Sequence, residues 1–386
     1  MKKNTTLVTA GRPHQRPTHT VNPSVERAST ILFATYEDMT ASTGKITYGR
    51  LGTSTHRALE DAVTALEGGV ETRLFGSGLQ ACALSILAFV KAGDDVLMTD
   101  SAYDPTRKFC DRFLTRFGVT TRYYDPSVGA SIADLITDKT KVIFAESPGS
   151  LTFEVQDLPA LASAAKAGGA KLVVDNTWSG GYYLKPLAHG ADVSVQAGTK
   201  YMSGHSDCLI GSATAADDES ARALFHAQLQ LGVNVSADDA WLALRGLRSL
   251  GARLPLHEAN GLKLAKWLVK RPEVARVLHP ALKGAPGHAL WKRDFTGASS
   301  LFGVVLKPVD VAGQRAFFNA LSLFGMGYSW GGFESLCIKV EPELNRTATE
   351  WRDEGIVLRF HIGLEDVDDL TNDLNGAFEA MAAARG

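Results

Sequence analysis

The chain has 386 residues, of which 45% are hydrophobic, and its 40 Lys and Arg nearly balance its 42 Asp and Glu. This length suffices for two or three domains with a large buried core. The near-neutral charge excludes the basic surface typical of nucleic-acid-binding proteins and the polybasic cluster that binds anionic membranes.

The sequence also lacks the patterns of a targeting segment or a metal site. Thr and Asn residues interrupt the first 13 positions, so no secretory signal is predicted there, and the longest apolar run, 81–90, is about half a membrane span. The four cysteines form no C-x-x-C pair and no zinc spacing. We therefore expect a reduced, cytoplasmic protein without a metal, in which each cysteine is a small buried side chain: Cys82, Cys110, Cys208 and Cys337.

The first part of the chain predicts an arm followed by alternating helices and strands. Residues 1–50 are rich in Thr, Pro and Gly, lack periodicity, and indicate an extended arm. Order is predicted to begin near Thr53, with a helix that Ser54 or Thr55 caps and that ends at Gly68 and Gly69. Helices over 79–91 and 158–169 then alternate with β-type runs at 72–78, 94–100, 141–147, 171–178 and 191–200. Continuous Val, Leu and Ile runs between helices predict a parallel sheet buried on both faces.

The later part of the chain predicts a second, smaller domain. Residues 238–270 read as mostly helical, with a break near Pro255, and form a connection into that domain. Strands at 301–307, 335–340 and 355–363 and a helix at 367–383 indicate an α+β unit. We predict an arm over 1–50, a large α/β domain over 51–246 and a smaller C-terminal domain over 247–386.

Three strand ends carry residues that suggest a shared site, because ligands bind where the strands of an open parallel sheet end. Gly76-Ser77-Gly78 lies between a strand and a helix, where backbone N–H groups can hold a phosphate, although such a sequence also makes ordinary turns. Asp175 could be a helix cap or a buried counter-ion, and a lone lysine such as Lys200 is usually a surface residue. Together they are the groups that pyridoxal 5′-phosphate (PLP) requires: a lysine for the Schiff base, an acid for the pyridine nitrogen and a phosphate loop.

At this point the sequence resembles a known family. The segments DNTW (175–178) and AGTKYMSGHSD (197–207) are similar to the signature of the Cys/Met-metabolism PLP enzymes of fold type I. The similarity extends over most of the chain, including YGRLGT (48–53), SAYDP (101–105), ESPGS (146–150) and YSWGGFES (328–335). It implies a mostly parallel sheet, a cytoplasmic homotetramer with sites shared between subunits, and a carbon–sulfur lyase of methionine biosynthesis. The last three motifs favour α,β-elimination from an amino-acid thioether.

The resemblance assigns cofactor roles residue by residue. Lys200 would form the Schiff base and carry protons, and Asp175 would pair with the pyridine nitrogen. Tyr103 would stack on the cofactor ring. Tyr48 and Arg50 would reach the phosphate of a neighbouring subunit's cofactor, and either tyrosine could accept the proton of the substrate amine if nearby cations lowered its pKa. Phosphate contacts are implied for the N–H groups of Gly78 and Leu79 and for the hydroxyl of Thr199.

It also assigns the substrate side of the site. Arg359 would bind the substrate α-carboxylate in a bidentate pair. Ser329 would orient that carboxylate or the lysine, and Trp330 would line the pocket. Many family members have serine three residues before the lysine, where this chain has Ala197, so Ser77 or water would supply that phosphate contact. We interpret His205 as a structural histidine.

Three alternatives remain at this stage. Enzymes of the same family that catalyse γ-elimination or γ-replacement share the cofactor residues. A nicotinamide-dependent oxidoreductase would also place strand–GSG–helix at a ligand, but Ala81 occupies the position of the third glycine of that fingerprint. A non-catalytic binding protein would leave the combination of Lys200, Asp175, Tyr103 and Arg359 unexplained.

Overall fold

The structure is a computed structural model that describes residues 1–12, 20–41, 46–342, 346–352 and 355–384. At its centre lies a seven-stranded sheet in the order β1-β7-β6-β5-β4-β2-β3. The strands from β6 to β3 are parallel, whereas β7 is antiparallel to both of its neighbours. The mostly parallel sheet predicted from the sequence is therefore confirmed. Its strands are β1 Glu71–Phe75, β2 Asp95–Thr99, β3 Thr120–Tyr124, β4 Thr140–Glu146, β5 Lys171–Asp175, β6 Val193–Ala197 and β7 Gly211–Ala215.

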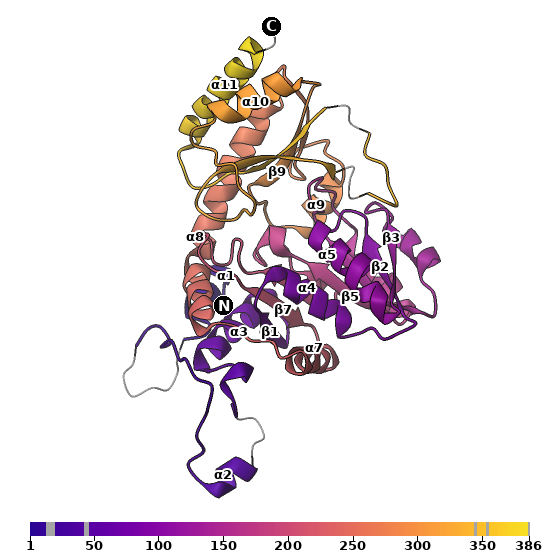
Figure 1. The fold of residues 1–386 in the computed structure, drawn as a ribbon, viewed down its shortest axis with the longest axis vertical. Helices are drawn as coiled ribbons and strands as arrows, with labels where there is room; N and C mark the ends of the chain where they lie inside the picture. The colour runs from indigo at the N-terminus through magenta and orange to yellow at the C-terminus, as the bar shows by residue number, and fades with distance from the viewer. Residues whose placement is uncertain (13–19, 42–45, 343–345, 353–354, 385–386) are drawn as a thin grey trace.

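Helices cover both faces of this sheet, which explains why β2, β4 and β5 carry continuous apolar runs rather than alternating ones (Figure 1). On β4, Val142 and Phe144 belong to the apolar core of one face and Ile143 to that of the other. One core includes α4 Gly78–Leu87 and α7 Asp218–Gln230. The other includes α3 Ser54–Glu67, α6 Leu158–Ala167 and the first part of α8 Ala237–Leu268.

A second, antiparallel sheet carries the C-terminal part of the chain, in the order β10-β11-β9-β8. Its core also includes the last part of α8. This arrangement confirms the predicted smaller α+β unit. The elements of this part are β8 Val274–Leu278, α9 His288–Asp294, β9 Leu301–Leu306, α10 Val311–Ala320, β10 Leu336–Val340, β11 Val357–His361 and α11 Val367–Ala383.

The predicted break near Pro255 is wrong, because α8 runs without interruption through the proline. Leu250 and Leu254 are buried in the core of the large sheet, and Leu264 and Leu268 in that of the small one. This burial on both sides of the proline offsets the roughly 3 kcal/mol that a proline costs inside a helix. Since α8 packs on both sheets, the predicted boundary at residue 246 falls within a continuous helix.

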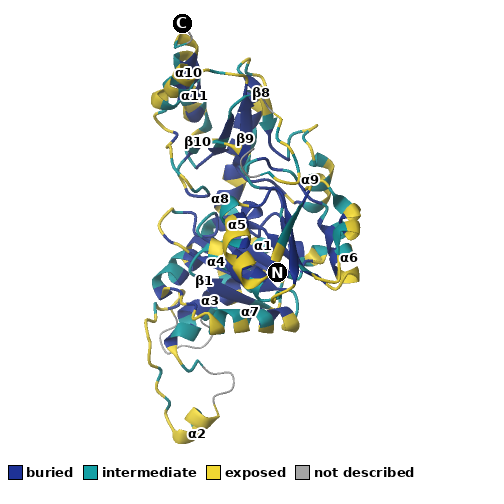
Figure 2. Cartoon of the chain, turned by 45° about the vertical axis from the view of Figure 1, so that its right-hand side comes forward, coloured by how far each residue is buried: buried dark blue, intermediate teal, exposed yellow. Residues whose placement is uncertain are grey.

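The N-terminal arm differs in part from the prediction. Residues 3–9 form a helix, α1 Lys3–Thr9, rather than extended chain, because Leu7 is buried against α8 and the Leu7 carbonyl accepts a hydrogen bond of 2.8 Å from Arg248 Nη1. The described residues from 20 to 48 are mostly extended, apart from the short helix α2 Tyr36–Thr40, which has no buried residue. Figures 1 and 2 show this segment projecting from the body of the chain.

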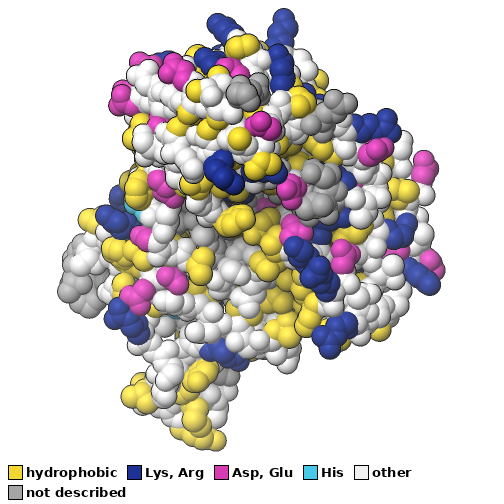
Figure 3. Space-filling model, turned by 45° about the horizontal axis from the view of Figure 1, so that its top comes forward, with side chains coloured by type: hydrophobic (Ala, Val, Ile, Leu, Met, Phe, Trp, Pro, Cys, Tyr) yellow, Lys and Arg dark blue, Asp and Glu magenta, His cyan; other side chains and the backbone are white. Residues whose placement is uncertain are grey.

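Other sequence-level expectations can be compared with the structure. All four cysteines are free and buried, as predicted. Acidic and basic side chains are interspersed on the face drawn in Figure 3, as the balanced charge suggests. Among the described residues, no helix is long and apolar enough to cross a membrane, and no group of three or more His, Cys, Asp or Glu could hold a metal ion.

Candidate active site

The carboxyl ends of β4, β5 and β6 bring three ionisable residues to one edge of the large sheet. Glu146 ends β4 and lies opposite Asp175 at the end of β5, and Asp175 lies opposite Val195 of β6. Lys200 follows β6 by three residues. Because neighbouring parallel strands end at the same edge, side chains far apart in the sequence meet there.

These residues line a pocket of about 270 Å³ between the large sheet and the C-terminal part of the chain. The pocket wall includes all but two of the site residues predicted from the sequence: Gly78, Leu79, Tyr103, Asp175, Thr199, Lys200, Ser329, Trp330 and Arg359. Tyr48 and Arg50 do not line it. Tyr48 is 48% exposed, and Arg50 Nη1 donates a hydrogen bond of 3.2 Å to the Leu229 carbonyl.

Lys200 is the buried amine of the pocket. Its Nζ donates a hydrogen bond of 2.7 Å to Ser329 Oγ and lies 5.4 Å from the centre of the Trp330 ring. Burial and, to a smaller extent, the nearby cation of Arg359 lower the pKa of Lys200 to about 8, against the opposing effect of Asp175. An amine with this pKa exchanges protons readily near neutral pH, as a nucleophile and proton carrier must.

Asp175 is a buried carboxylate that lacks a strong partner on one oxygen. Oδ1 accepts hydrogen bonds from the Thr177 N–H, at 3.0 Å, and from its hydroxyl. The only contact of Oδ2 among the described residues is the Cys82 thiol at 3.5 Å, a weak donor. Burial raises the pKa of Asp175 although the Thr177 bonds lower it. A cationic ring nitrogen is the kind of partner that this carboxylate would stabilise.

Glu146 is a pocket residue to which the sequence analysis gave no role. Its Oε2 accepts a hydrogen bond of 2.7 Å from the Tyr103 N–H, and burial together with the adjacent Asp175 raises its pKa well above the usual value. The sequence contained a signal for this role, because Glu146 lies near the end of the β-type run 141–147, which precedes the run that carries Asp175.

The pKa of Tyr103 is raised within the single chain, where the cations expected to lower it, Arg50 of a neighbouring subunit and the Schiff base, are not at the pocket. Partial burial and the Glu146 carboxylate raise it, and together they outweigh the Arg359 guanidinium, which lowers it. Within one chain the Tyr103 phenol is therefore held in its protonated form.

The N-terminus of α4 forms the opposite wall. A Cβ on Gly78 would lie 2.3 Å from the Ala197 Cβ, so only glycine lets the helix approach the end of β6 this closely. The first N–H groups of the helix, those of Gly78 and Leu79, have no hydrogen-bond partner among the described residues. Ser77 caps the helix by accepting from the Gln80 N–H, which leaves its own hydroxyl proton free for an anion.

Thr199 and His205 flank the lysine in different environments. The Thr199 hydroxyl donates to the Ile210 carbonyl at 3.2 Å and accepts from the Ile210 N–H at 3.0 Å, while the residue lines the pocket. Its contact with a phosphate therefore stays a prediction. His205 does not line the pocket, and its Nδ1 lies 2.6 Å from the Ser203 carbonyl, as expected of a structural histidine.

The C-terminal part of the chain contributes a turn and an arginine. Ser329 has a φ of 93°, in the left-handed region that non-glycine residues rarely adopt, and its carbonyl accepts a hydrogen bond of 3.0 Å from Arg359 Nη2. Burial lowers the pKa of Arg359 to about 10. The Ser329 carbonyl is the only hydrogen-bond partner of the Arg359 guanidinium among the described residues, so its other donors can bind a carboxylate.

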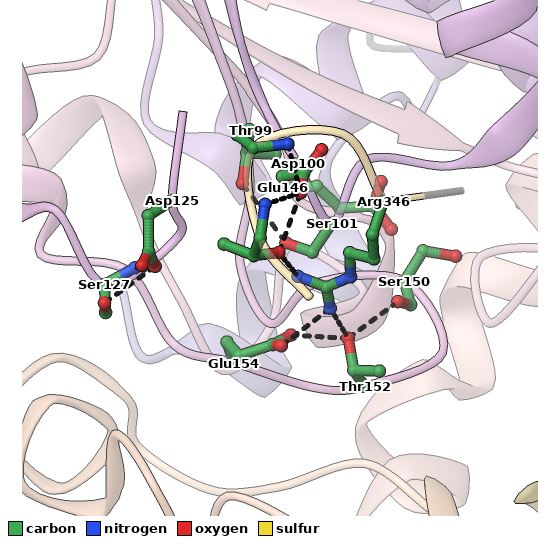
Figure 4. Close-up of polar contacts among 12 residues, drawn as sticks. Thr99, Asp100, Ser101, Asp125, Ser127, Glu146, Ser150, Thr152, Glu154 and Arg346 are labelled. Carbon is green, nitrogen blue, oxygen red and sulfur yellow. Dashed lines mark hydrogen bonds and ion pairs between the residues drawn. The ribbon is translucent and has the colours of Figure 1, made fainter. Parts of the chain in front are cut away.

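A cluster around Asp100 joins the two parts of the chain behind the pocket wall (Figure 4). The Asp100 carboxylate accepts the N–H groups of three consecutive residues, Thr347 at 2.9 Å, Ala348 at 3.0 Å and Thr349 at 2.7 Å, and both threonine hydroxyls. It also pairs with Arg107 at 3.0 Å. Asp100 follows β2 and precedes Tyr103 by three residues, so the cluster fixes the segment that carries Tyr103.

Arg346 connects the same loop to a second pocket segment. Its Nη2 lies 2.7 Å from Glu154 Oε1 and also contacts the Thr152 hydroxyl, as Figure 4 shows. That segment is tied in turn to the residues after Asp100, because the Ser150 N–H donates a hydrogen bond of 2.7 Å to the Ser101 carbonyl. Both walls are thus held by one loop of the C-terminal part.

The donor set fits pyridoxal 5′-phosphate. Lys200 would hold its aldehyde carbon, Asp175 its pyridine nitrogen, and the N–H groups of Gly78 and Leu79 its phosphate. Fold and pocket together define a PLP-dependent enzyme of fold type I.

Comparisons with known proteins agree with this class. The sequence profile described as "Cys/Met metabolism PLP-dependent enzyme" matches residues 4–379. The chain therefore belongs to the family of Cys/Met-metabolism PLP-dependent enzymes. This membership decides against the nicotinamide alternative.

Individual relatives cover almost the whole chain. It is 46% identical to a cystathionine β-lyase of Salmonella typhimurium, over 97% of this chain and 98% of the relative, and 46% identical to the cystathionine β-lyase MetC of Escherichia coli, over 98% of each. A crystal structure of cystathionine γ-synthase from Xanthomonas oryzae pv. oryzae, in complex with aminoacrylate and cysteine, is 31% identical. It superposes with a TM-score of 0.92 over 100% of this chain and 99% of the other.

The Asp100 cluster generates a first prediction. Asp100→Asn should lower the free energy of unfolding by about 3 kcal/mol, because an amide cannot accept all these N–H and O–H donors and leaves the buried Arg107 without its charge partner. The hydrogen bonds, together with Arg107, lower the pKa of Asp100 below 3.8 although burial opposes them, so this stabilisation is complete above that pH and is lost as the pH falls through the folded-state pKa. Urea unfolding of both proteins at several pH values measures the difference, which should narrow on acidification.

Asp104→Asn is the matched control. Asp104 lies on the same segment but pairs with Lys108 in a partly exposed i,i+4 arrangement, so its removal should cost less than about 0.5 kcal/mol. Equal effects of the two substitutions would contradict the role given to Asp100.

Proposed function

We propose that this protein is a cystathionine β-lyase of methionine biosynthesis. The reaction converts L-cystathionine and water to L-homocysteine, pyruvate and ammonia by α,β-elimination. The observation that carries the proposal is that one pocket contains both Lys200, an amine of lowered pKa, and Arg359, a guanidinium with donors available for a carboxylate. The 46% identity to β-lyases over nearly full length, against 31% to a γ-synthase, supports the β-specific form. Free, buried cysteines support a cytoplasmic location.

Arg359 would bind and orient the substrate. Its guanidinium can form two parallel hydrogen bonds to the α-carboxylate while one nitrogen stays on the Ser329 carbonyl. This fixes the α-carbon relative to Lys200, because Ser329 also contacts Lys200 Nζ. The turn at Ser329 would therefore align Arg359, which binds the substrate, with Lys200, which reacts with it.

Lys200 would move the protons. Bound PLP supplies an electron sink for the negative charge that develops at the substrate α-carbon. Lys200 Nζ takes the α-proton, for which it must be neutral, and its lowered pKa provides that form near pH 8. The resulting ammonium can then give a proton to the leaving thiolate. The Trp330 ring close to Nζ keeps bulk water away from this transfer.

The proposal includes a homo-oligomer, a tetramer built from two dimers, with sites shared between subunits. Apolar side chains on the projecting segment are exposed, most of all Leu32 at 88% and Tyr36 at 70%. Tyr48 and Arg50, at the end of this segment, do not line the pocket of their own chain. A second copy would cover the apolar residues and receive Tyr48 and Arg50 at its cofactor phosphate.

Product analysis tests the reaction. L-Cystathionine should yield pyruvate and homocysteine in equal amounts, measured by a coupled dehydrogenase and a thiol reagent. Lys200→Ala should lower turnover by about 10³-fold or more and abolish covalent attachment of PLP by borohydride. Lys171→Ala, at the opposite end of β5, should retain both. Formation of 2-oxobutyrate and cysteine as the main products would identify γ-elimination instead.

Substrate binding by Arg359 gives a second test. Arg359→Ala should raise KM about 100-fold with a smaller change in kcat, because it removes a charge-assisted pair to the carboxylate of the bound substrate. Arg359→Lys should lie between the parent and Arg359→Ala, since lysine keeps the charge without the fork. Arg352, whose side chain is largely exposed, serves as the control position. An unchanged KM in Arg359→Ala would remove this residue from the site.

Mixing of subunits tests the shared site. Arg50→Ala and Lys200→Ala should each be inactive at limiting PLP, but reassembly of the two together should recover about a quarter of the parent activity. Half of randomly formed dimers are hybrids, and each hybrid has one intact site of two. Lys200→Ala mixed with Asp175→Ala should recover nothing, because both residues belong to the same chain's site. No recovery in the first mixture, with exchange shown by light scattering or labelled subunits, would place Arg50 outside the site.

A further inference from the structure

Directly behind Lys200 lies a buried polar cluster, the histidine cluster, that the proposed reaction does not use. It consists of His257, Ser300, Tyr201 and His361, each no more than 1% exposed. His361 is two residues after Arg359 on β11, so both side chains point to the same face of the strand. The cluster therefore packs against the wall formed by Arg359 and the turn that follows Ser329.

The hydrogen bonds of Ser300 fix the direction of donation within the cluster. Its shortest contact is with the Ile362 carbonyl at 2.6 Å, which can only accept, so the Ser300 hydroxyl donates there. Tyr201 accepts the Ser300 N–H at 3.2 Å and directs its own proton to Ser300 Oγ, also at 3.2 Å. Ser300 Oγ also lies 3.3 Å from two ring nitrogens, His361 Nδ1 and His257 Nδ1, and so connects both histidines to the cluster.

The other nitrogen of His361 meets the backbone of the active-site turn. His361 Nε2 lies 3.1 Å from the Gly331 N–H, which donates, and 3.1 Å from the Gly332 carbonyl, which accepts. The ring can therefore bond to this turn in either neutral tautomer. Complete burial and the neighbouring His257 and Arg359 lower the pKa of His361 well below 6.5, which favours the neutral ring.

We propose that His361 is a positioning residue of this active site: its Nε2 bonds to the Gly331 N–H or the Gly332 carbonyl and holds the 329–332 turn against Lys200. Gly331 has a φ of 87°, and a Cβ there would lie 2.8 Å from the Lys200 carbonyl carbon and 3.0 Å from its Cα. The turn thus rests on the backbone of Lys200 itself. Two residues earlier the same turn meets Lys200 Nζ through Ser329.

Loss of the His361 side chain should change the position of the Lys200 amine. The strained φ of Ser329 needs support from its surroundings, and the described contacts that supply it are Arg359 on its carbonyl and His361 on the following backbone. Without His361 a polar backbone group of the turn, the Gly331 N–H or the Gly332 carbonyl, loses this partner, and the turn relaxes away from Lys200. A shift of about 1 Å at a reacting group costs roughly 10²-fold in rate.

The test compares two side chains of similar length. His361→Met has neither a strong donor nor a strong acceptor, whereas the amide of His361→Gln offers both to the Gly331 N–H and the Gly332 carbonyl. We expect His361→Met to shift the visible absorption and circular dichroism of bound PLP and to lower kcat about 100-fold, with a smaller change in KM. His361→Gln should recover most of both. His279→Met, a buried histidine bonded to the Ala281 N–H outside the cluster, should lower the melting temperature without moving the PLP spectrum.

Two results would overturn the proposal. If Met and Gln at position 361 give the same PLP spectrum and the same kcat, the polar contact of His361 with the turn has no positioning role. If His361→Met yields no folded protein, Ser300→Ala replaces it, because this change removes the hydroxyl that holds His361 Nδ1, and an unchanged spectrum in Ser300→Ala also refutes the proposal. The inference rests on the proposed function only for the substrate of the kinetic assay. The spectrum needs no substrate, so failure to cleave cystathionine would count against that function alone.

Discussion

Burial of the Lys200 amine is the constraint on which the rest of the site depends. An ammonium group removed from water is unstable unless a carboxylate pairs with it, yet Lys200 Nζ has a hydroxyl, Ser329 Oγ, as its hydrogen-bond partner. Asp175 is near enough to favour the charged form, but its hydrogen bonds go to Thr177 and Cys82. The positive charge of Arg359 disfavours the charged form of Lys200. The fold thereby keeps an amine that can exist in both its charged and neutral forms, and under the proposed function the Asp175 carboxylate would pair with a cofactor nitrogen instead.

The two halves of the site come from different parts of the chain, so their relative position must be fixed. The large sheet contributes the cofactor side, and β11 with the preceding turn contributes the substrate side. Three features hold them together: the unbroken helix α8, the loop held by Asp100, and the contact of Gly331 with the Lys200 backbone. Each of these three features links the two halves of the site through strong or closely packed contacts. Rigidity of this kind suits chemistry in which one lysine must reach both the α-proton and the leaving group.

The cofactor half of the site was predictable from the sequence because its signals are local. Continuous apolar runs identify buried parallel strands, and a residue that ends such a strand lies at the ligand edge, as Asp175 does. The substrate half needed the family resemblance, since nothing near Ser329 or Arg359 in the sequence shows that they meet Lys200. Long-range packing explains the two wrong predictions. Residues 3–9 were expected to be extended but form a helix, because Leu7 is buried against α8, and α8 continues through Pro255 because it is buried against both sheets. His361 had no signal of its own, because its role depends on a turn 30 residues away.

Selection between β- and γ-elimination has to lie outside the groups described so far. Lys200, Asp175 and Arg359 serve steps that both reactions share, so under the proposed function discrimination falls to the wall that surrounds the leaving half of the substrate. That wall includes Leu151 and Phe153, both with positive φ, on the segment that Arg346 contacts through Glu154. Non-glycine residues hold such conformations only when neighbouring structure imposes them. The loop that joins the two halves would then also shape the part of the pocket that recognises the substrate, so stability and specificity would depend on the same few hydrogen bonds.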